Sequence, residues 1–436
     1  MKEFFKYPTY KSSGVEWLGD VPTHWTVKRL KYVVSINDDT LPEDADADYE
    51  FSYVDIGSVD NEHGITSKET MVFENAPSRA RRVVLRGDTI ISTVRTYLRA
   101  IAPITEKDRT IVSTGFAVVR PRHIDAGYLS YYVRSQFFVE NVVSKSVGVS
   151  YPAINALDIG NIPSLLPSLS EQKAIAAFLD RETERIDGLI GKREKLIVLL
   201  QEKRAALISH AVTKGLNPSA KMKPSGIDWL GDIPAHWNIW KIGHGYLETG
   251  SGTTPPSDSD DWYDGAINWV TTSELREKPI FESSKKISES ALETFSALRL
   301  FPKGTLLIAM YGATIGRLGT LETEATTNQA CCALVKSNVF RNQFVFYWFQ
   351  SFKNIVVLLA SGGGQPNISQ DKIRSLEVAI PSFGEQDEIT SYLDVETKKI
   401  EGLMEREQQI IERMKEYRSA LISAAVTGKI DVREGV

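Results

Sequence analysis

The chain repeats itself once, at an offset close to half its length. SGVEWLGDVPTHW at 13–25 returns as SGIDWLGDIPAHW at 225–237. A second pair begins EQKAIAAFLD at 171 and EQDEITSYLD at 385, so it is offset by 214 residues. Because the chain has 436 residues, two copies fill it almost completely. A period of this length indicates a duplicated domain rather than a solenoid of short repeats, and it predicts a pseudo-two-fold internal arrangement.

Composition is that of an ordinary two-domain protein. With a mass of 48.6 kDa and 42% hydrophobic residues, the chain can bury two cores of normal size. No run approaches the roughly 20 apolar residues that cross a bilayer, and the first residues lack the apolar segment of a secretion signal. The two cysteines, Cys331 and Cys332, are adjacent and lie in an apolar ACCALV context, which favours buried strand positions. We therefore expect a cytoplasmic protein with no membrane association.

The C-terminal part of each copy has the pattern of a long helix. A row of positions spaced by seven, from about 170 to 213 and from about 384 to 427, is apolar except at Arg193 and Glu407, which hold equivalent places, and charged residues lie between these positions. Sustained heptads of this kind predict coiled-coil helices. The stretch KGLNPSAKMKPSG at 214–226 predicts a linker between the copies. The recurring positions are Leu179, Ile186, Leu200 and Leu207 in the first copy and Leu393, Ile400, Met414 and Leu421 in the second, with a second row that includes Leu189, Leu196, Leu403 and Ile410.

The remaining segments, 26–165 and 238–380, have mixed α/β patterns. Short β-rich runs such as 81–93 and 302–312 alternate with turn residues, and 124–143 and 340–359 read as helices. These two segments hold equivalent places in the repeat, but their sequences have diverged. The predicted fold class is therefore α+β: two α/β domains and two long coiled-coil helices in a pseudo-two-fold duplication. We expect the similar helices and tryptophan elements of the two copies to bind two copies of one partner. We expect the dissimilar globular segments to recognise two different targets.

Charge is unevenly distributed along the first copy. The net charge of −5 argues mildly against a polyanionic partner. Residues 79–134 nevertheless contain eleven Lys and Arg against four Asp and Glu, whereas 38–62 is strongly acidic. A local basic face can attract nucleic acid in a chain that is acidic overall. The alternative is that these charges are scattered over a solvated surface.

Motifs for catalysis are missing. The chain has no phosphate-binding G-x4-G-K-[ST], no H-E-x-x-H, no C-x-x-C and no Asn-Pro-Pro-Tyr motif of adenine methyltransferases. Six scattered histidines do not suggest a metal site. We predict that the chain is not an enzyme by itself and binds no cofactor or metal.

The repeated W-L-G-D-[VI]-P-x-H-W element contains half of the eight tryptophans. One interpretation is an aromatic clasp that pins the start of each copy to its long helix. The other is a direct contact with a protein partner, because tryptophan is enriched at such contacts. The candidate partner-binding residues are Trp17, Trp25, Trp229 and Trp237.

Taken together, these features resemble the specificity subunit of type I restriction–modification enzymes over essentially the whole chain. The resemblance rests on the two W-L-G-x-x-P-x-H-W elements and on the two helices that open E-Q-x-x-I and close A-L-I-S-x-A-V-T. It also rests on SGTTPPSDSDDWYDGAINWVTTSEL (251–275), YGATIGRLG (311–319) and TTNQACCAL (326–334) in the second copy. RGDTIISTVRTYLRAIA (86–102) and VSTGFAVVRP (112–121) are looser counterparts in the first.

This resemblance implies two target-recognition domains held apart by two antiparallel spacer helices. Each domain would read one half of an asymmetric bipartite site in double-stranded DNA. Two copies of a methyltransferase subunit carrying S-adenosylmethionine would dock on the chain. Restriction subunits using ATP and Mg²⁺ would join them. The expected segments are domain 1 at 1–169, spacer helix 1 at 170–216, domain 2 at 217–383, and spacer helix 2 with the C-terminal tail at 384–436.

Candidate DNA-binding residues follow from the chemistry of base and phosphate contacts. Arginine pairs with guanine or phosphate, and amides pair with adenine. On this basis Arg317 is a candidate guanine reader and Gln329 a candidate adenine reader. The full set is Arg79, Arg81, Arg82, Arg95, Tyr97 and Arg99 in the first domain, and Gly250, Ser251, Gly252, Thr253, Thr254, Tyr311, Thr314, Arg317, Gln329 and Gln365 in the second.

Two other readings fit parts of the sequence. A duplicated coiled-coil adaptor would bind protein partners without DNA. A fused methyltransferase and recognition enzyme would require the catalytic motifs that are missing. A steep salt dependence of duplex binding distinguishes DNA recognition from the adaptor.

Overall fold

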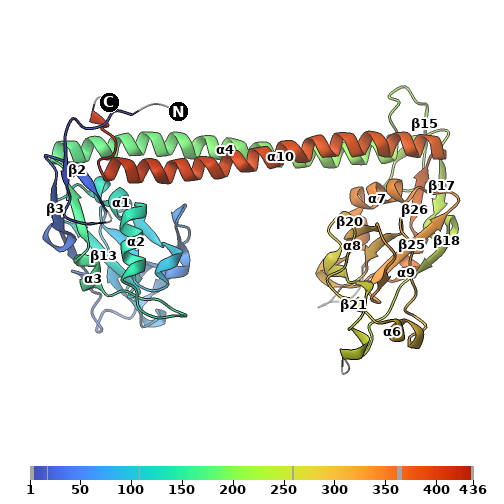
Figure 1. Ribbon diagram of the computed structural model, residues 1–436, viewed down its shortest axis with the longest axis horizontal. Coiled ribbons are helices and arrows are strands. Elements are labelled where there is room, and N and C mark those ends of the chain that lie inside the picture. Colours follow the sequence, from blue (N-terminus) through green and yellow to red (C-terminus); the bar gives the residue numbers. More distant parts are fainter. Residues whose placement is uncertain (1–3, 17, 108, 258–259, 361–365, 434–436) are drawn as a thin grey trace. The chain divides into compact units, whose positions relative to one another are not determined.

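A computed structural model describes residues 4–16, 18–107, 109–257, 260–360 and 366–433 (Figure 1). The chain divides into two compact units. The first comprises Met1–Glu194 with Gln408–Val436, and the second comprises Lys195–Glu407. The long helices α4 (Leu169–Lys214) and α10 (Phe383–Val426) each contribute one half to each unit.

The first unit contains fourteen strands and three shorter helices among its described residues, besides its halves of α4 and α10. Its strands are β1 (Tyr10–Ser12), β2 (Asp20–Pro22), β3 (Thr26–Arg29), β4 (Val34–Ile36), β5 (Glu50–Val54), β6 (Val59–Asp60), β7 (Gly64–Ile65), β8 (Glu69–Val72), β9 (Ala80–Val83), β10 (Thr89–Ser92), β11 (Ile101–Pro103), β12 (Thr110–Ser113), β13 (Phe116–Pro121) and β14 (Pro163–Leu166). Its shorter helices are α1 (Ala126–Arg134), α2 (Gln136–Ser144) and α3 (Ala156–Gly160).

The second unit has twelve strands and five shorter helices among its described residues. Its strands are β15 (Met222–Pro224), β16 (Asp232–Pro234), β17 (Asn238–Lys241), β18 (Tyr246–Gly250), β19 (Ile267–Val270), β20 (Lys278–Ile280), β21 (Lys286–Ile287), β22 (Leu306–Ala309), β23 (Leu318–Leu321), β24 (Thr326–Thr327), β25 (Cys331–Ser337) and β26 (Glu377–Ile380). Its shorter helices are α5 (Ile242–Gly245), α6 (Glu289–Thr294), α7 (Asn342–Ser351), α8 (Lys353–Leu358) and α9 (Gln370–Ser375).

The two diverged globular parts share one sheet topology. In the first unit a sheet runs β11-β10-β13-β4, and in the second its counterpart runs β23-β22-β25-β18 with β20 added at one edge. A second sheet also repeats in part. In it, β12 pairs with β5 in parallel and β24 pairs with β19 in parallel, while β8 and β21 pair antiparallel with β5 and β19. In the first unit β9 adds a fourth strand, antiparallel to β12. The duplication predicted from the sequence therefore extends into the parts whose sequences no longer match.

Apolar side chains fill the space between these sheets. In the first unit Ile90, Val112 and Phe116 belong to one buried cluster that draws on both sheets. In the second unit Leu307 and Cys331 hold the corresponding places. Both cysteines are buried in β25 and are free thiols, and burial raises the pKa of each. The ACCALV run is thus a core strand.

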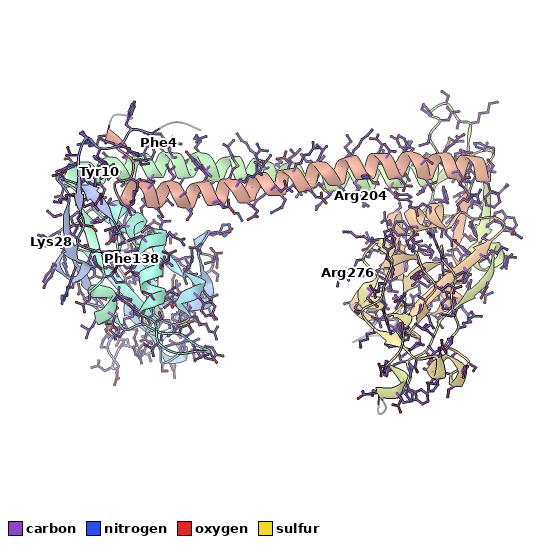
Figure 2. All side chains as sticks on the ribbon, in the orientation of Figure 1. Phe4, Tyr10, Lys28, Phe138, Arg204 and Arg276 are labelled. Atoms are coloured by element: carbon purple, nitrogen blue, oxygen red, sulfur yellow. The ribbon has the colours of Figure 1, made fainter. Side chains whose placement is uncertain are left out.

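Within each unit the long helices lie antiparallel and pack as a coiled coil. In the first unit the hydroxyl of Tyr128, on α1, lies 3.0 Å from the carbonyl oxygen of Leu165 and 3.2 Å from that of Val426, at the end of α10. In the second, Arg204 of α4, labelled in Figure 2, pairs with Glu401 of α10 at 3.2 Å. The predicted fold class, α+β with a duplicated pair of long helices, is confirmed.

Three details differ from the sequence prediction. The helix expected at 124–143 is two helices, because Ser135 leaves helical geometry and caps α2 by accepting a hydrogen bond from the Phe138 N–H. The helix expected at 340–359 also breaks, at Phe352, but there without a side-chain cap. The second apolar row of the coiled coil is incomplete, since Leu196 is 41% exposed and Leu403 is 45% exposed.

Candidate nucleic-acid interface

Two equivalent hairpin loops form the centre of the candidate interface. The first loop, residues 93–100, joins β10 to β11, and the second loop, residues 310–317, joins β22 to β23. Both have eight residues and enclose a short 3-10 turn, Thr96–Leu98 in the first and Gly312–Thr314 in the second. Since the flanking strands are counterparts, we treat the two loops as the same structural element.

The loops share an unusual backbone. The third and seventh residues have positive φ angles in both: 50° at Arg95 and 55° at Arg99 in the first loop, and 61° at Gly312 and 73° at Gly316 in the second. Glycine adopts this left-handed conformation readily, whereas other residues adopt it at a cost. The two loops thus have positive φ angles at the same two positions, with arginine in one copy and glycine in the other, while the 3-10 turn begins one position earlier in the second loop.

The first loop rests on a neighbouring segment, residues 146–153. Val94 forms a β-bridge with Ala153, and the Thr96 and Ser146 hydroxyls are 2.8 Å apart. The Arg95 guanidinium lies over the ring of Tyr151, 4.9 Å from its centre. Tyr151 itself is 65% exposed. The two segments therefore form one surface, in which a cation is stacked on an exposed aromatic ring.

The rest of the first loop is also accessible. Tyr97 is 53% exposed and Leu98 is 49% exposed. Arg99 is partly buried, and its Nη1 donates to Oε1 of Gln136 on α2 at 3.2 Å. Neither Arg95 nor Arg99 forms an ion pair with any acidic side chain in the described part of the chain. Their charges are not neutralised within the unit.

The other predicted arginines of the first domain differ in position. The Arg79 carbonyl accepts from Thr114, and the Gly115 carbonyl accepts from Thr93, so Arg79 lies close to the first loop. Its guanidinium, however, pairs with Asp55 at 2.8 Å. Arg81 lies over the Phe73 ring and Arg82 reaches Thr40, both along β9 in the other sheet. The structure thus places the Arg79 backbone near the loop that carries Arg95, Tyr97 and Arg99, and leaves Arg81 and Arg82 apart from it.

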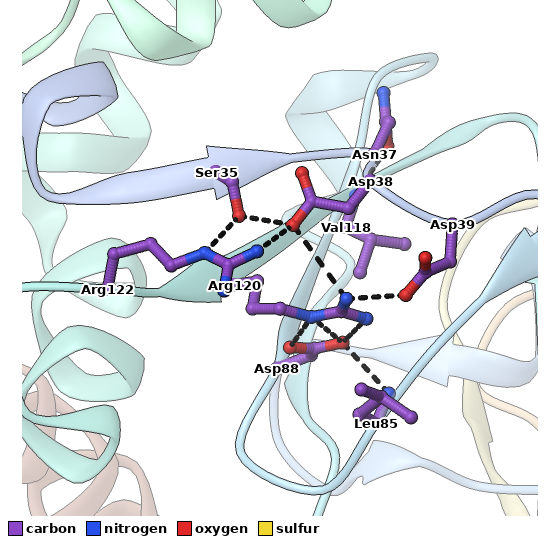
Figure 3. Close-up of polar contacts among 9 residues, drawn as sticks. All are labelled: Ser35, Asn37, Asp38, Asp39, Leu85, Asp88, Val118, Arg120 and Arg122. Carbon is purple, nitrogen blue, oxygen red and sulfur yellow. Dashed lines mark hydrogen bonds and ion pairs between the residues drawn. The ribbon is translucent and has the colours of Figure 1, made fainter.

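Some arginines of the basic run at 79–134 form ion pairs inside the domain (Figure 3). Arg120 pairs with the buried carboxylate of Asp88 at 2.9 Å and with Asp39 at 2.5 Å, and Arg122 pairs with Asp38 at 2.6 Å. A hydrogen bond from Ser35, supported by the two arginines, lowers the pKa of Asp38. The interpretation of this whole run as a basic face is therefore wrong in part, because the acidic stretch at 38–62 neutralises some of its charges.

The charge of Arg134 is not available to a basic face either, for a different reason. It is partly buried and lies over the ring of Tyr131, and desolvation lowers its pKa. By contrast, the side chain of Arg86 is exposed. Arg109 is also exposed, and its guanidinium lies over the Tyr49 ring. The accessible positive charge is therefore concentrated at fewer residues than the sequence count suggests.

In the second unit the predicted loop Gly250–Thr254 packs against the turn before β25. The N–H of Gly252 donates to the Thr327 hydroxyl at 3.0 Å, and a Cβ added at Gly252 would lie 1.7 Å from the Thr327 carbonyl oxygen. The Trp269 indole donates to the Thr253 carbonyl at 3.0 Å, and the Thr254 hydroxyl donates to Gln329 at 2.6 Å. Only glycine permits this approach at 252. Ser251, between the two glycines, is partly exposed.

The second loop lies at the same end of its sheet. The N–H of Met310 donates to Ala330, next to Gln329. Tyr311 is 44% exposed, and its carbonyl accepts from the Thr314 hydroxyl at 2.8 Å. Arg317 closes the loop and is partly exposed. The described candidates of the second domain therefore gather in one place, while Gln365 lies outside the described residues.

Two residues of these surfaces were not predicted. Tyr151 occupies the repeat position of Gln365, because SVGVSYPAIN (146–155) aligns with ASGGGQPNIS (360–369) at the 214-residue offset. That alignment was the signal that could have identified it. Arg299 donates to the Thr249 carbonyl at 2.9 Å and covers Gly250, with its guanidinium 5.5 Å from the Phe301 ring centre. No sequence pattern marks Arg299.

The repeated tryptophan element forms a clasp on each long helix. In the first unit the Trp25 indole donates to Oε1 of Glu171 at 3.1 Å, and His24 Nε2 lies 2.9 Å from Oε2. In the second unit the Trp237 indole donates to Glu385 at 3.1 Å, and His236 lies 2.8 Å from the same carboxylate. These equivalent sets of contacts explain why both the W-L-G-x-x-P-x-H-W element and the E-Q motif repeat.

The four tryptophans do not play one role. Trp25 and Trp237 are fully buried, so they present no side-chain surface to a partner. Trp229 is 38% exposed and packs edge-on against Phe352, with 4.8 Å between ring centres. Trp17 lies outside the described residues. The clasp interpretation therefore fits Trp25 and Trp237, and the partner-contact prediction stands for Trp229.

Among the described residues, no group of three or more His, Cys, Asp or Glu side chains is arranged to hold a metal ion. Within the same ranges, no helix combines the length and apolar character needed to span a bilayer.

Comparison with known proteins identifies the family. Residues 22–197 and 237–413, well over half of the chain, match the family model described as the type I restriction modification DNA specificity domain. The chain is similar to the putative type I restriction enzyme MjaX specificity subunit of Methanocaldococcus jannaschii, with 24% identity over 99% of both chains. It is also similar to the type I restriction enzyme StySPI specificity subunit of Salmonella potsdam, with 23% identity over 66% of this chain and 64% of the relative.

Solved structures share the fold. A chain from a structure addressing complex assembly and conformational transition of the type I R-M system matches with a TM-score of 0.76 and 22% identity, over 93% of this chain and 98% of the other. The HsdS subunit from Thermoanaerobacter tengcongensis matches with a TM-score of 0.56 and 23% identity, over 94% and 98%. The match of both repeats to a DNA specificity domain favours DNA recognition over the adaptor alternative. The chain belongs to the family of type I restriction–modification DNA specificity subunits, as a non-catalytic subunit with two target-recognition domains.

Proposed function

We propose that the two domains read the two unlike halves of one bipartite site in double-stranded DNA. The observation that carries this proposal is the pair of hairpin loops, which have the same length, equivalent flanking strands and positive φ angles at the same two positions, but different side chains. The first loop presents Arg95, Tyr97 and Arg99, and the second presents Tyr311, Thr314 and Arg317. Equivalent loops with unequal side chains suit two readers of the same kind of target with different sequences.

Within this proposal the candidate residues have different tasks. Arg81 and Arg82, which lie on β9 apart from the first loop, supply positive charge to phosphates, as does Arg79, whose guanidinium also pairs with Asp55. In the second domain Gly250 and Gly252 allow the close packing that presents Ser251, Thr253, Thr254 and Gln329, and Gln365 belongs to the same set. Phosphate contacts fix position on the duplex, and base-edge contacts select sequence. The reading domains are residues 1–169 and 217–383, and the helices at 170–216 and 384–436 set the spacing between half-sites.

We further propose that the repeated frame, meaning the two W-L-G-x-x-P-x-H-W elements with the long helices α4 and α10, docks two copies of a methyltransferase subunit, which carries S-adenosylmethionine. Restriction subunits that use ATP and Mg²⁺ complete the assembly, and the complex works in the cytoplasm. The frame offers exposed apolar residues at equivalent places: Leu169 and Phe383, at the starts of α4 and α10, are 57% and 36% exposed. Trp229 adds a further exposed ring in the second unit.

A salt titration tests DNA recognition directly. The full chain, purified with its methyltransferase partner, is titrated against a duplex containing the methylated motif of the host genome and against a scrambled duplex. We expect the logarithm of the binding constant to fall linearly with that of the salt concentration, with the motif duplex preferred at every salt concentration. Equal binding of both duplexes would overturn sequence reading by this chain. Loss of the chain from the methyltransferase during purification would overturn only the docking proposal.

A further inference from the structure

The first loop keeps two arginines where its backbone favours glycine. An L-residue in left-handed helical geometry is strained relative to the right-handed form, and glycine avoids this strain. The second loop avoids this backbone strain, since Gly312 and Gly316 occupy the same two positions. A strained residue that persists next to an available glycine alternative points to a function for its side chain.

Contacts within the unit do not account for Arg95. Its resolved contact is the stack on Tyr151, a ring that is itself 65% exposed. An exposed cation–π contact is weak and does not exceed the strain of the left-handed conformation. Arg99 differs, because it is partly buried and donates to Gln136, whose own N–H donates to Ser423 of α10 at 3.1 Å. Arg99 therefore has a structural partner that Arg95 lacks.

The surroundings of Arg95 suit a base contact. Stacking on Tyr151 holds the planar guanidinium in a defined orientation, and no acidic side chain in the described residues neutralises it. An oriented guanidinium presents two parallel donors, which match O6 and N7 of guanine in the major groove. The neighbouring Tyr97 and Leu98 are half exposed, so the tip of the loop is open to a ligand.

We propose that Arg95, oriented by Tyr151, contacts a guanine in the half-site read by the first domain, and that Arg99 is a positioning residue that anchors the loop to α2. This inference rests on the proposed DNA-reading function. In the second domain the position of Arg95 is taken by Gly312, so the guanine contact has no counterpart there. The two half-sites differ at this position because one loop carries a side chain and the other does not.

The test uses variants that separate folding from reading. Arg95→Gly places the favoured residue at a left-handed position, so its melting temperature should equal or exceed that of the unchanged chain. Arg95→Lys keeps the charge and loses the two-donor fork. Arg99→Gly is the matched control, since it changes the other left-handed arginine of the same loop. Each full-length variant is co-purified with the methyltransferase partner.

The readout is binding to duplexes randomised at each position of the bipartite motif. We expect Arg95→Gly and Arg95→Lys to relax preference at one G·C pair of one half-site by roughly 5- to 150-fold, the range of a bidentate arginine–guanine contact. The other half-site should be unchanged, and Tyr151→Ala should relax the same base pair. Arg99→Gly should weaken binding to all sequences about equally.

Two results would overturn the assignment. One is an unchanged sequence preference in both Arg95 variants. The other is a uniform loss of affinity in Arg95→Gly with a shallower salt dependence and no change in Arg95→Lys, which identifies a phosphate contact. If the unchanged chain showed no sequence preference, the proposed function itself would fail, and that result is distinguishable from either outcome.

Discussion

Arg418 of α10 pairs with Asp187 of α4, 2.9 Å apart, in the first unit. The repeat offset of 214 residues maps Asp187 onto Glu401 and Arg418 onto Arg204, which form the pair seen in the second unit. One interhelical contact is therefore made twice, with the same polarity. The long helices are duplicated at the level of single ion pairs as well as in their heptad pattern.

These two ion pairs are partly exposed, so we expect each to contribute little. A double-mutant cycle on Asp187→Ala and Arg418→Ala should give a coupling free energy of about 0.2–1 kcal/mol, as for other exposed pairs. The cycle on Glu401→Ala and Arg204→Ala should give a similar value. Chemical denaturation of the full chain measures both. A clear coupling in one cycle and none in the other would contradict the equivalence of the two contacts.

Alkaline pH should weaken the clasp of the first unit. Burial, with the hydrogen bond that Tyr7 donates to Glu171 at 2.8 Å, raises the pKa of Tyr7 well above its ordinary value. A raised pKa stabilises the fold below the unfolded tyrosine pKa of about 10, and that stabilisation is lost as the pH rises above it. Tyr7→Phe should therefore reduce the fall in unfolding free energy above pH 10, by at most about 1.4 kcal/mol per pH unit.

The control for Tyr7 is Tyr32→Phe, which removes an exposed phenol of the same unit. Denaturation series between pH 8 and about pH 11 compare the three proteins. A Tyr7→Phe curve parallel to that of the unchanged chain would contradict this role for the Tyr7 proton.

The buried network around Arg120 should dominate the local stability of the first domain. The Asp88 side chain is 2% exposed and that of Arg120 is 13% exposed. Removing one partner leaves a buried charge, which typically costs about 3–5 kcal/mol. We therefore expect Arg120→Met to lower the unfolding free energy by that amount, while Arg86→Met, at an exposed position, changes it by less than about 0.5 kcal/mol. Equal effects of the two substitutions would show that the network is not needed for stability.

Docking of the methyltransferase can be tested at the two exposed helix starts. Leu169→Asp and Phe383→Asp each place a charge at one of two equivalent sites. We expect each single variant to bind one methyltransferase copy and the double variant to bind none, as counted by native mass spectrometry. Leu157→Asp on α3, where the side chain is 79% exposed, is the control. Two bound copies in the double variant would exclude these residues from the docking surface.

Local patterns predicted the frame well because its signals are local. Heptad spacing located α4 and α10, which span Leu169–Lys214 and Phe383–Val426 against expected ranges of about 170–213 and 384–427. The repeated motifs likewise marked the clasp. Ser135 was missed as a helix boundary, because a serine inside an apolar pattern becomes a cap only when tertiary packing turns the chain there.

Long-range pairing limited the prediction of the interface. Arg120 and Asp39 are 81 residues apart, so composition alone could not show that their charges cancel. The positive φ angles of Arg95 and Arg99 were equally hidden, since arginine at a left-handed position has no sequence signature. In the second copy Gly312 and Gly316 do mark the turn, and the equal loop lengths transfer that information to the first copy only after the strands have been paired.

The positive φ angles shared by the two loops also bear on how new specificities arise. In the second loop, glycine takes the left-handed conformation at the third and seventh positions without strain. Exposed residues elsewhere in that loop can then change the DNA that is read without adding backbone strain, whereas a side chain added at Gly312 or Gly316 must compensate for its own strain. In the first loop the two arginines already carry that strain, so the two domains do not have the same freedom to acquire new specificities.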